Sequence, residues 1–195
     1  MNRMIADEAK LWADVRQRLS DFRFYHSQCV AAAAEQLART YGWDPEKARL
    51  AGAVHDILKE QPRQEALAFF AENGVELTPL ERLCPKLWHA MAGEIYLRKT
   101  YGLPQDMLLA VRYHTTGREN MTLPEQILFT ADFISDDRDY NGVEDMRRRA
   151  KISLPLCMEE GLRFTIEELS RSCRPIHPDT LGAYNQILTE KGTNI

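Results

Sequence analysis

The sequence has few cysteines, and their spacing argues against two common kinds of structure. None belongs to a C-x-x-C pair, whereas zinc knuckles and disulfide frameworks need closely or regularly spaced cysteines. We therefore expect free thiols. The two in apolar stretches, Cys29 and Cys157, are interpreted as small core residues. The full set is Cys29, Cys84, Cys157 and Cys173.

Long apolar runs and an excess of positive charge are also missing. No run approaches the ~18 residues that a membrane span requires, and the first ten residues lack the basic and apolar segments of a signal peptide. We therefore expect a cytoplasmic protein with no membrane partner. The net charge is −4, whereas nucleic-acid-binding proteins usually present a basic surface. We expect no nucleic-acid partner.

The alternation of apolar and polar residues that is typical of β-strands is absent as well. Apolar residues recur at helical spacing, and glycine and proline separate the segments. The sequence predicts an all-α fold, a helical bundle in one domain whose length allows a sizeable core. Predicted helices cover residues 44–59 and 86–101, with an irregular stretch between 74 and 86. A long helical region covers 143–173, and Pro155 is expected to kink or break it.

What the sequence does contain is an anomaly in the second half of the 44–59 helix. His55 and Asp56 lie side by side in an otherwise apolar run from Ala53 to Leu58. Burying a polar group without a partner costs roughly 2–7 kcal/mol, and burying a charge costs more. A metal ion satisfies both residues at once, because it binds a neutral imidazole together with an ionised carboxylate.

Other residues of the same types repeat this anomaly. Asp132 lies in a second apolar segment, and four of the five histidines lie in or at the ends of predicted apolar helices. No pair has the i, i+4 spacing, so tertiary packing has to assemble the site. Ligands without thiolate favour iron, manganese, zinc or nickel. The candidate metal ligands are His26, His55, Asp56, His89, His114 and Asp132.

The order of these residues resembles the metal pattern of HD-domain phosphohydrolases. Longer strings narrow the resemblance to the YqeK family over about residues 18–187. They are Arg-Phe-Tyr-His at 23–26, His-Asp-Ile-Leu-Lys-Glu at 55–60, Arg-Tyr-His-Thr-Thr-Gly-Arg at 112–118, Ala-Asp at 131–132 and Ile-His-Pro at 176–178. The string at 112–118 is the most specific of them.

The resemblance implies an activity and a domain layout. YqeK-type proteins use a metal-activated water to hydrolyse diadenosine tetraphosphate symmetrically to two ADP. The implied layout is an HD domain over residues 18–195, whose C-terminal helices close the nucleotide pocket, preceded by a helical extension over 1–17. The implied partner is a dinucleoside polyphosphate or a purine nucleoside diphosphate. Oligomeric state stays open, with a homodimer allowed.

The resemblance also implies roles for individual residues. The primary metal ligands are His26, His55, Asp56 and Asp132, and iron is the expected metal, as one or two ions, with Mn, Zn or Ni as alternatives. Either His89 and His114 complete a second metal position or they face phosphate. Asp56 or Asp132 is the candidate base, and Lys59 completes the catalytic set. The expected substrate-binding residues are Arg23, Lys59, His89, His114, Thr115, Thr116, Gly117, Arg138, Ile176 and His177.

The chain departs from the family pattern in two places. An acidic turn at 136–142 replaces a less acidic one, and extra carboxylates there are expected to weaken the field of Arg138. Tyr184 stands where relatives often have arginine, which puts contacts from the last helix in doubt. Two other functions stay open: a phosphohydrolase for another nucleotide, and a catalytically silent regulator that binds a purine nucleoside diphosphate.

Overall fold

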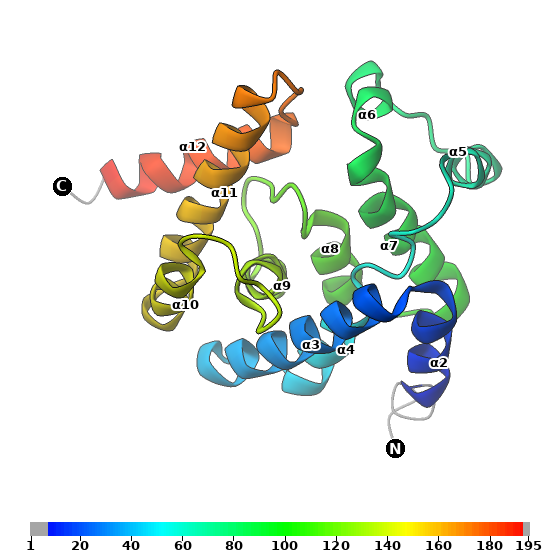
Figure 1. Cartoon of the computed structure of the whole chain (residues 1–195), viewed down its shortest axis with the longest axis horizontal. Helices are drawn as coiled ribbons and strands as arrows, with labels where there is room; N and C mark the ends of the chain where they lie inside the picture. Colours follow the sequence, from blue (N-terminus) through cyan, green and yellow to red (C-terminus); the bar gives the residue numbers. More distant parts are fainter. Residues whose placement is uncertain (1–7, 193–195) are drawn as a thin grey trace.

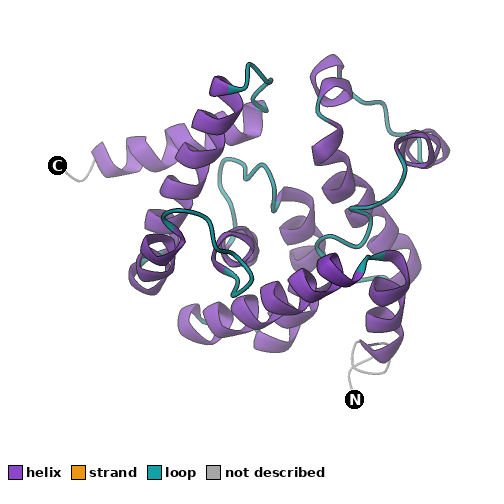
Figure 2. Ribbon diagram, in the orientation of Figure 1, coloured by secondary structure: helices purple, strands orange, loops and turns teal. Residues whose placement is uncertain are grey.

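The computed structural model describes residues 8–192, and within that range the chain consists of helices joined by loops (Figure 2). This confirms the predicted all-α fold. The helices are α2 (Glu8–Arg18), α3 (Asp21–Tyr41), α4 (Pro45–Val54), α5 (Arg63–Glu72), α6 (Pro79–Leu83), the 3-10 helix η1 (Pro85–Leu87), α7 (Trp88–Tyr101), α8 (Gln105–Tyr113), α9 (Leu123–Ile134), α10 (Val143–Ile152), α11 (Leu154–Arg171) and α12 (Pro178–Gly192).

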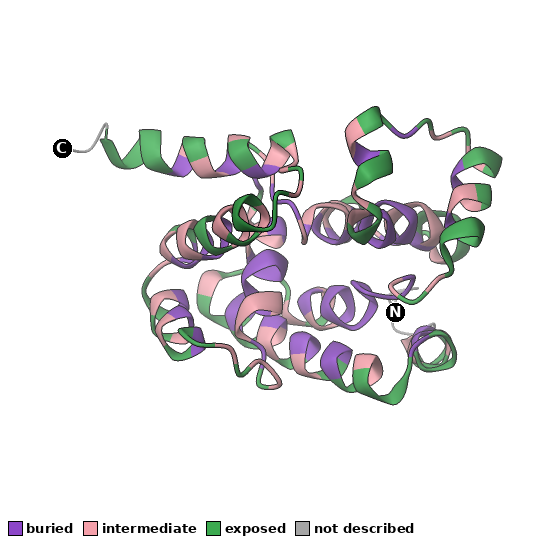
Figure 3. Cartoon of the chain, turned by 45° about the horizontal axis from the view of Figure 1, so that its top comes forward, coloured by how far each residue is buried: buried purple, intermediate pink, exposed green. Residues whose placement is uncertain are grey.

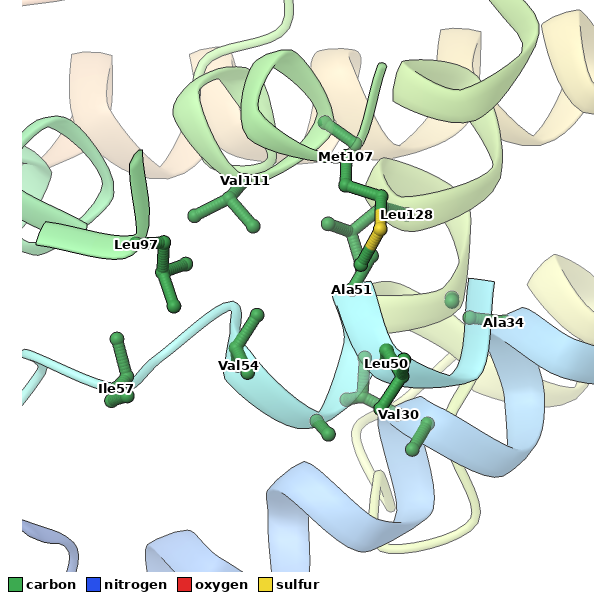
Figure 4. Packing of buried hydrophobic residues seen from close by; sticks show 14 of the residues in the cluster. Val30, Ala34, Leu50, Ala51, Val54, Ile57, Leu97, Met107, Val111 and Leu128 are labelled. Atoms are coloured by element: carbon green, nitrogen blue, oxygen red, sulfur yellow. The ribbon is translucent and has the colours of Figure 1, made fainter. Parts of the chain in front are cut away.

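Five helices form the centre of the molecule. Helix α3 packs along α4 and α9, and α8 lies against both α7 and α9 (Figure 1). Small side chains let α3 and α4 approach closely: the Cβ of an alanine at position 52 would lie 2.7 Å from the Cα of Ala31. Larger apolar side chains fill the space between the helices (Figure 4): Val30, Leu50, Val54, Leu97, Met107, Val111 and Leu128.

The remaining helices flank this centre on two sides. Helices α5 and α6 lie beside α7, while α10, α11 and α12 lie beyond α9 on the opposite side (Figure 1). Buried residues gather on the central helices, whereas α5, α6 and α12 are largely exposed (Figure 3). Within residues 8–192, every helix is too short or too polar to cross a lipid bilayer.

The predicted extension over residues 1–17 is described only from residue 8 onward, so residues 1–7 of that prediction lie outside the described part. Leu11 and Val15 of α2 are buried in the same apolar core as α3 and α4. The boundary between an extension and an HD domain therefore stays a prediction.

The main local difference from the prediction lies at the end of α4. The α-helix ends at Val54 instead of continuing to residue 59, and residues 55–60 form tight turns. Backbone bonds there join residues three apart, including Ile57 N–H to Val54 O at 3.0 Å and Lys59 N–H to Asp56 O at 2.8 Å. Three-residue spacing aligns the side chains of residues i and i+3. Asp56 and Lys59 therefore lie on the same side, with Lys59 Nζ 3.3 Å from Asp56 Oδ1.

Two other boundaries also differ. The stretch predicted as irregular contains α6, whose start has a capping box: Thr78 Oγ1 accepts from Glu81 N–H, and Glu81 Oε2 accepts from Thr78 N–H. The predicted 86–101 helix is split into η1 and α7. The expected break near Pro155 is present, since α10 ends at Ile152 and α11 begins at Leu154.

Candidate metal and phosphate site

The six predicted metal ligands come from five separate elements and meet in the centre of the molecule. Three ring contacts link the four imidazoles in a chain, with centroid distances of 5.2 Å for His26–His55, 5.0 Å for His55–His114 and 5.1 Å for His89–His114. Their positions in the fold are His26 on α3, His55 and Asp56 in the turns after α4, His89 in the first turn of α7, His114 at the end of α8, and Asp132 near the end of α9.

Three of the imidazoles are held by their Nδ1 atoms. His55 Nδ1 donates to Gly52 O at 2.7 Å, and His114 Nδ1 donates to Val111 O at 2.7 Å. His26 Nδ1 lies 2.7 Å from a carboxylate oxygen of Asp137, which can only accept, so this nitrogen also carries a proton. A neutral imidazole that donates from Nδ1 has its lone pair on Nε2. Such outer hydrogen bonds are typical of metal-binding histidines.

The Nε2 atoms face the two carboxylates. His26 Nε2 is 3.0 Å and His55 Nε2 is 3.9 Å from Asp132 Oδ1, while His55 Nε2 is 3.6 Å from Asp56 Oδ2. Atoms of His26, His55 and Asp132 lie within 4.8 Å of one another, and so do atoms of His55, Asp56 and His114. Two candidate ligand groups therefore share His55.

The protonation states in the site suit a cation. Burial lowers the pKa of His55 to about 3 and that of His89 to about 4, so both imidazoles are neutral at pH 7. Burial opposes ionisation of Asp56, but the neighbouring His55 and His89 hold its pKa well below the usual range. Burial likewise opposes ionisation of Asp132, but its contact with His26 and the charge of Arg138 hold its pKa well below the usual range. Neutral imidazoles and ionised carboxylates are the forms that bind divalent metals.

Unpartnered atoms give a direct test of whether a metal fits. His55 Nε2 is buried and makes no hydrogen bond among the described residues. Asp56 Oδ1 also lacks a hydrogen bond there, and its close contacts are the ionic ones with Lys59 and His89. His55 is fully buried, and Asp56 is only 1% exposed. An unpaired buried acceptor costs about 1–3 kcal/mol, and more when it is charged. A divalent cation removes this penalty, so the residues present fit a metal ion.

Three cationic side chains surround the carboxylates. Arg23 Nη1 is 3.4 Å from Asp56 Oδ2, and Lys59 Nζ is 3.3 Å from Asp56 Oδ1 and 3.2 Å from His89 Nε2. Arg138 donates to both the side chain and the backbone carbonyl of Asp132. The structure thus places Arg23, Lys59 and Arg138 beside the candidate metal ligands.

The loop after α8 contributes polar groups next to His114. The hydroxyls of Thr115 and Thr116 are buried and make no hydrogen bond within the described chain. Gly117 has φ +63°, in the region that favours glycine. A Cβ at position 117 would lie 3.3 Å from Met121 Sδ and 3.4 Å from Ala183 Cβ, so this glycine also lets the loop pack against α12.

A cavity of about 300 Å³ connects this loop with the segment before α12. Thr115 lies on one side, and His177 lies on the other, together with Arg174 and Thr180. His177 has a structural contact as well, because its Nδ1 accepts from the backbone N–H of Asp179 at 3.2 Å, in the first turn of α12. Ile176 lies beside it in the sequence and is partly buried.

Sequence reasoning missed the contribution of Asp137. It expected the acidic turn only to weaken Arg138, whereas Asp137 Oδ2 accepts from His26 Nδ1 and fixes the orientation of that ring. The contact joins residues 111 positions apart, and no local pattern in the sequence indicates it. The sequence contained one indication, which is that the acidic turn at residues 136–142 departs from the family pattern.

Comparison with known proteins agrees with this arrangement. The HD domain matches residues 23–136, more than half of the chain, and this range contains all six candidate metal ligands. The chain belongs to the HD-domain family. Membership of this family implies that a divalent metal is bound. It also confirms the resemblance to HD-domain proteins that the sequence showed.

Relatives narrow the family further. The chain is 39% identical over 178 residues to a protein of Halalkalibacterium halodurans named bis(5'-nucleosyl)-tetraphosphatase, symmetrical, covering 91% of this chain and 95% of the relative. A Bacillus subtilis protein of the same name is 33% identical over the same shares of the two chains. This HD-domain chain is therefore of the YqeK type, as its sequence strings predicted.

A solved structure extends the similarity to the whole fold. A Clostridium acetobutylicum protein, described as a predicted HD superfamily hydrolase involved in NAD metabolism, superposes with a TM-score of 0.90 at 33% identity. The similarity covers 93% of this chain and 97% of the other. The HD-domain bundle predicted from the sequence is confirmed.

Proposed function

We propose that this protein is a metal-dependent hydrolase that cleaves diadenosine tetraphosphate symmetrically to two ADP. The observation that carries the proposal is the buried His55 Nε2, which makes no hydrogen bond among the described residues and lies 3.6 Å from Asp56 Oδ2 in a cluster of histidines. Cationic side chains lie next to this cluster. The names of the relatives support the substrate, since two of them, similar along nearly their whole length, are called symmetrical bis(5'-nucleosyl)-tetraphosphatases.

The proposed metal ligands are the four that the family resemblance implies, His26, His55, Asp56 and Asp132, and each of them belongs to at least one of the two groups of converging donor atoms. Iron is the proposed metal, in keeping with the imidazole and carboxylate ligands and the lack of thiolate. The bound ion supplies positive charge that polarises a phosphoryl oxygen and lowers the pKa of water. His114 shares one ligand group with His55 and Asp56, and His89 approaches Asp56 Oδ1 to 3.0 Å, so both extend the site toward a second metal position or phosphate.

The protein's own residues have distinct proposed tasks. Arg23, Lys59 and Arg138 stabilise negative charge on the phosphates, because hydrogen bonds between charged groups are stronger than those between neutral ones. Thr115 and Thr116 offer hydroxyl donors, and the Gly117 turn brings their backbone close to the anion. Asp56 or Asp132 accepts the proton of the attacking water. The 300 Å³ cavity at Thr115 and His177 holds one nucleoside. Ile176 precedes His177 in the chain and is proposed to support this segment.

The test combines metal analysis with product analysis. We expect protein purified anaerobically to contain iron and to convert diadenosine tetraphosphate to ADP as sole product, seen by anion-exchange chromatography. ATP plus AMP would indicate asymmetrical cleavage and contradict the proposal. An Asp56→Asn variant should lose both metal and turnover, while Asp106→Asn, which removes a carboxylate bound to Lys47 away from the site, should keep both.

If diadenosine tetraphosphate is not cleaved, other nucleotides distinguish the two alternative functions. Release of product from cyclic dinucleotides or nucleoside triphosphates, with diadenosine tetraphosphate untouched, would indicate a phosphohydrolase for another nucleotide. Tight ADP or GDP binding without any product would indicate a regulator.

A further inference from the structure

A second cavity borders the metal site and shares lining residues with the Thr115–His177 cavity. It measures about 260 Å³ and is lined by Lys59 and His89, which both approach Asp56, and by residues around the start of α5 and η1. Pro85 and Lys86 line both cavities, so η1 forms a wall between them. Helices α6 and α7, which η1 joins, lie between α5 and the α11–α12 side of the molecule (Figure 1).

The lining of the second cavity is positively charged. Lys59, Arg63 and Lys86 line it, and no acidic residue belongs to its described lining. Glu60, next to Lys59, is engaged elsewhere, since its carboxylate accepts from Ser20 N–H at 2.6 Å and from Ser20 Oγ at 2.7 Å. Lys59 contacts Asp56 at the metal site, and Arg63 and Lys86 extend the positive charge along a described lining that contains no carboxylate. In a protein of net charge −4, such a lining indicates a site for an anion.

Two of these cations have no ionic partner within the described part of the chain. Among residues 8–192, no carboxylate lies within ion-pair distance of Arg63 or Lys86. The Arg63 guanidinium instead lies over the ring of Trp88, 5.4 Å from its centroid. Stacking orders the guanidinium while its N–H groups stay available, which lowers the entropy lost when an anion binds.

The cavity also contains an unused polar atom. Gln61 Oε1 is buried and makes no hydrogen bond among the described residues. An amide oxygen does not attract phosphate, but it accepts from a hydroxyl. A ligand that carries both phosphates and a sugar hydroxyl therefore matches this lining better than inorganic phosphate does.

We propose that this cavity binds the second nucleoside diphosphate half of the dinucleotide. Its phosphates contact Arg63, Lys86 and Lys59, and its ribose donates to Gln61 Oε1. The first half occupies the Thr115–His177 cavity, so the central phosphoanhydride lies between the two cavities, at the metal ligands. Because each cavity holds one nucleoside diphosphate, the bond presented to the metal ligands is the central one, and cleavage is symmetrical. This inference rests on the proposed function.

The test neutralises the unpaired cation that lines the second cavity and not the Thr115–His177 cavity, in the variant Arg63→Gln. The Arg63 side chain is exposed, so folding is expected to be preserved. Lys99→Gln is the matched control, because Lys99 is an exposed lysine on α7 that lines neither cavity. Calorimetry measures binding of ADP and of a diadenosine tetraphosphate analogue whose central bridging oxygen is replaced by methylene. Steady-state kinetics measures cleavage of the natural dinucleotide.

We expect Arg63→Gln to bind the analogue about tenfold more weakly, with its KM for the dinucleotide raised similarly and kcat changed less than about threefold. Binding of the first ADP equivalent should match that of the wild type and of Lys99→Gln. Unchanged analogue affinity would overturn the inference, and so would an equal loss of ADP affinity. If the wild type binds the analogue but cleaves nothing, the proposed function fails while the binding result still decides the inference.

Discussion

Asp137 gives a residue-scale test of how the metal ligands are oriented. Its carboxylate accepts from His26 Nδ1, which keeps the lone pair of that ring on Nε2, 3.0 Å from Asp132 Oδ1. Removing such an outer partner typically costs about 10–100-fold in metal affinity or activity. We expect Asp137→Ala to weaken metal binding by this factor, measured by competition with a chelator. Asp136→Ala, an exposed neighbour, should behave as wild type. Equal affinities in both variants would contradict the orienting role.

The cysteines provide a second residue-scale prediction, about reactivity. Cys157 is buried, and burial raises the pKa of its thiol to about 12, whereas Cys173 is exposed. Because the thiolate is the reactive form, the native protein has almost no reactive Cys157 at pH 8. Raising the pH from 7 to 9 leaves this thiol protonated, since both values lie below its pKa. We expect iodoacetamide to modify Cys173 and spare Cys157, as read by peptide mass spectrometry. Denatured protein, in which all four react, is the control.

At the scale of elements, the close contact of α3 and α4 positions the metal site. A Cβ at Gly52 would lie 2.7 Å from Ala31 Cα and 2.8 Å from Ala31 N, both of them backbone atoms. Gly52 O also accepts from His55 Nδ1. We expect Gly52→Ala to separate the helices, to lower the free energy of unfolding by at least about 1–3 kcal/mol, and to weaken metal binding. Urea unfolding measures the first effect.

Gly93 on α7 offers the matched control for this substitution. An added Cβ there would meet only side chains at ordinary contact distances, 3.7 Å from Val111 and 3.8 Å from Ile57. Alanine in a helix interior is more stable than glycine by roughly 0.5–1 kcal/mol. We expect Gly93→Ala to be neutral or stabilising. If both glycine variants are equally destabilised, the close α3–α4 contact does not explain the effect at Gly52.

The elements also show what the sequence could and could not predict. Periodicity and end signals located most helices, because these depend on neighbours in the chain. The helix predicted from residue 44 begins there, where Asp44 caps α4 by accepting from Glu46 N–H and Lys47 N–H. The end of α4 at Val54 was missed. Residues 55–58 have an apolar helical pattern, but tertiary contacts turn His55 and Asp56 toward α7, α8 and α9. The spacing of apolar residues along the chain carries no information about such tertiary contacts.

For the whole molecule, the metal ligands were predictable while their surroundings were not. His55, Asp56 and Asp132 stand out because a titratable group in an apolar segment is an energetic anomaly that one sequence already shows. Asp137, Arg63 and Lys86 have no such anomaly, since charged residues in polar segments are ordinary. Their relation to the site depends on how the acidic turn, α5 and η1 pack around the central helices.

Because the site joins five elements, metal binding is expected to stabilise the whole fold. A ligand that binds only the folded state adds about 4 kcal/mol of stability at a thousand times its Kd, and each kcal/mol raises Tm by about 2–4 °C in a chain of this size. Chelation should therefore lower Tm by roughly 10 °C, as measured by calorimetry. Asp132→Asn removes one ligand and should unfold at the same temperature with or without chelator. A wild-type Tm that chelation leaves unchanged, in protein shown to have contained metal, would mean that the ion binds without holding these helices together.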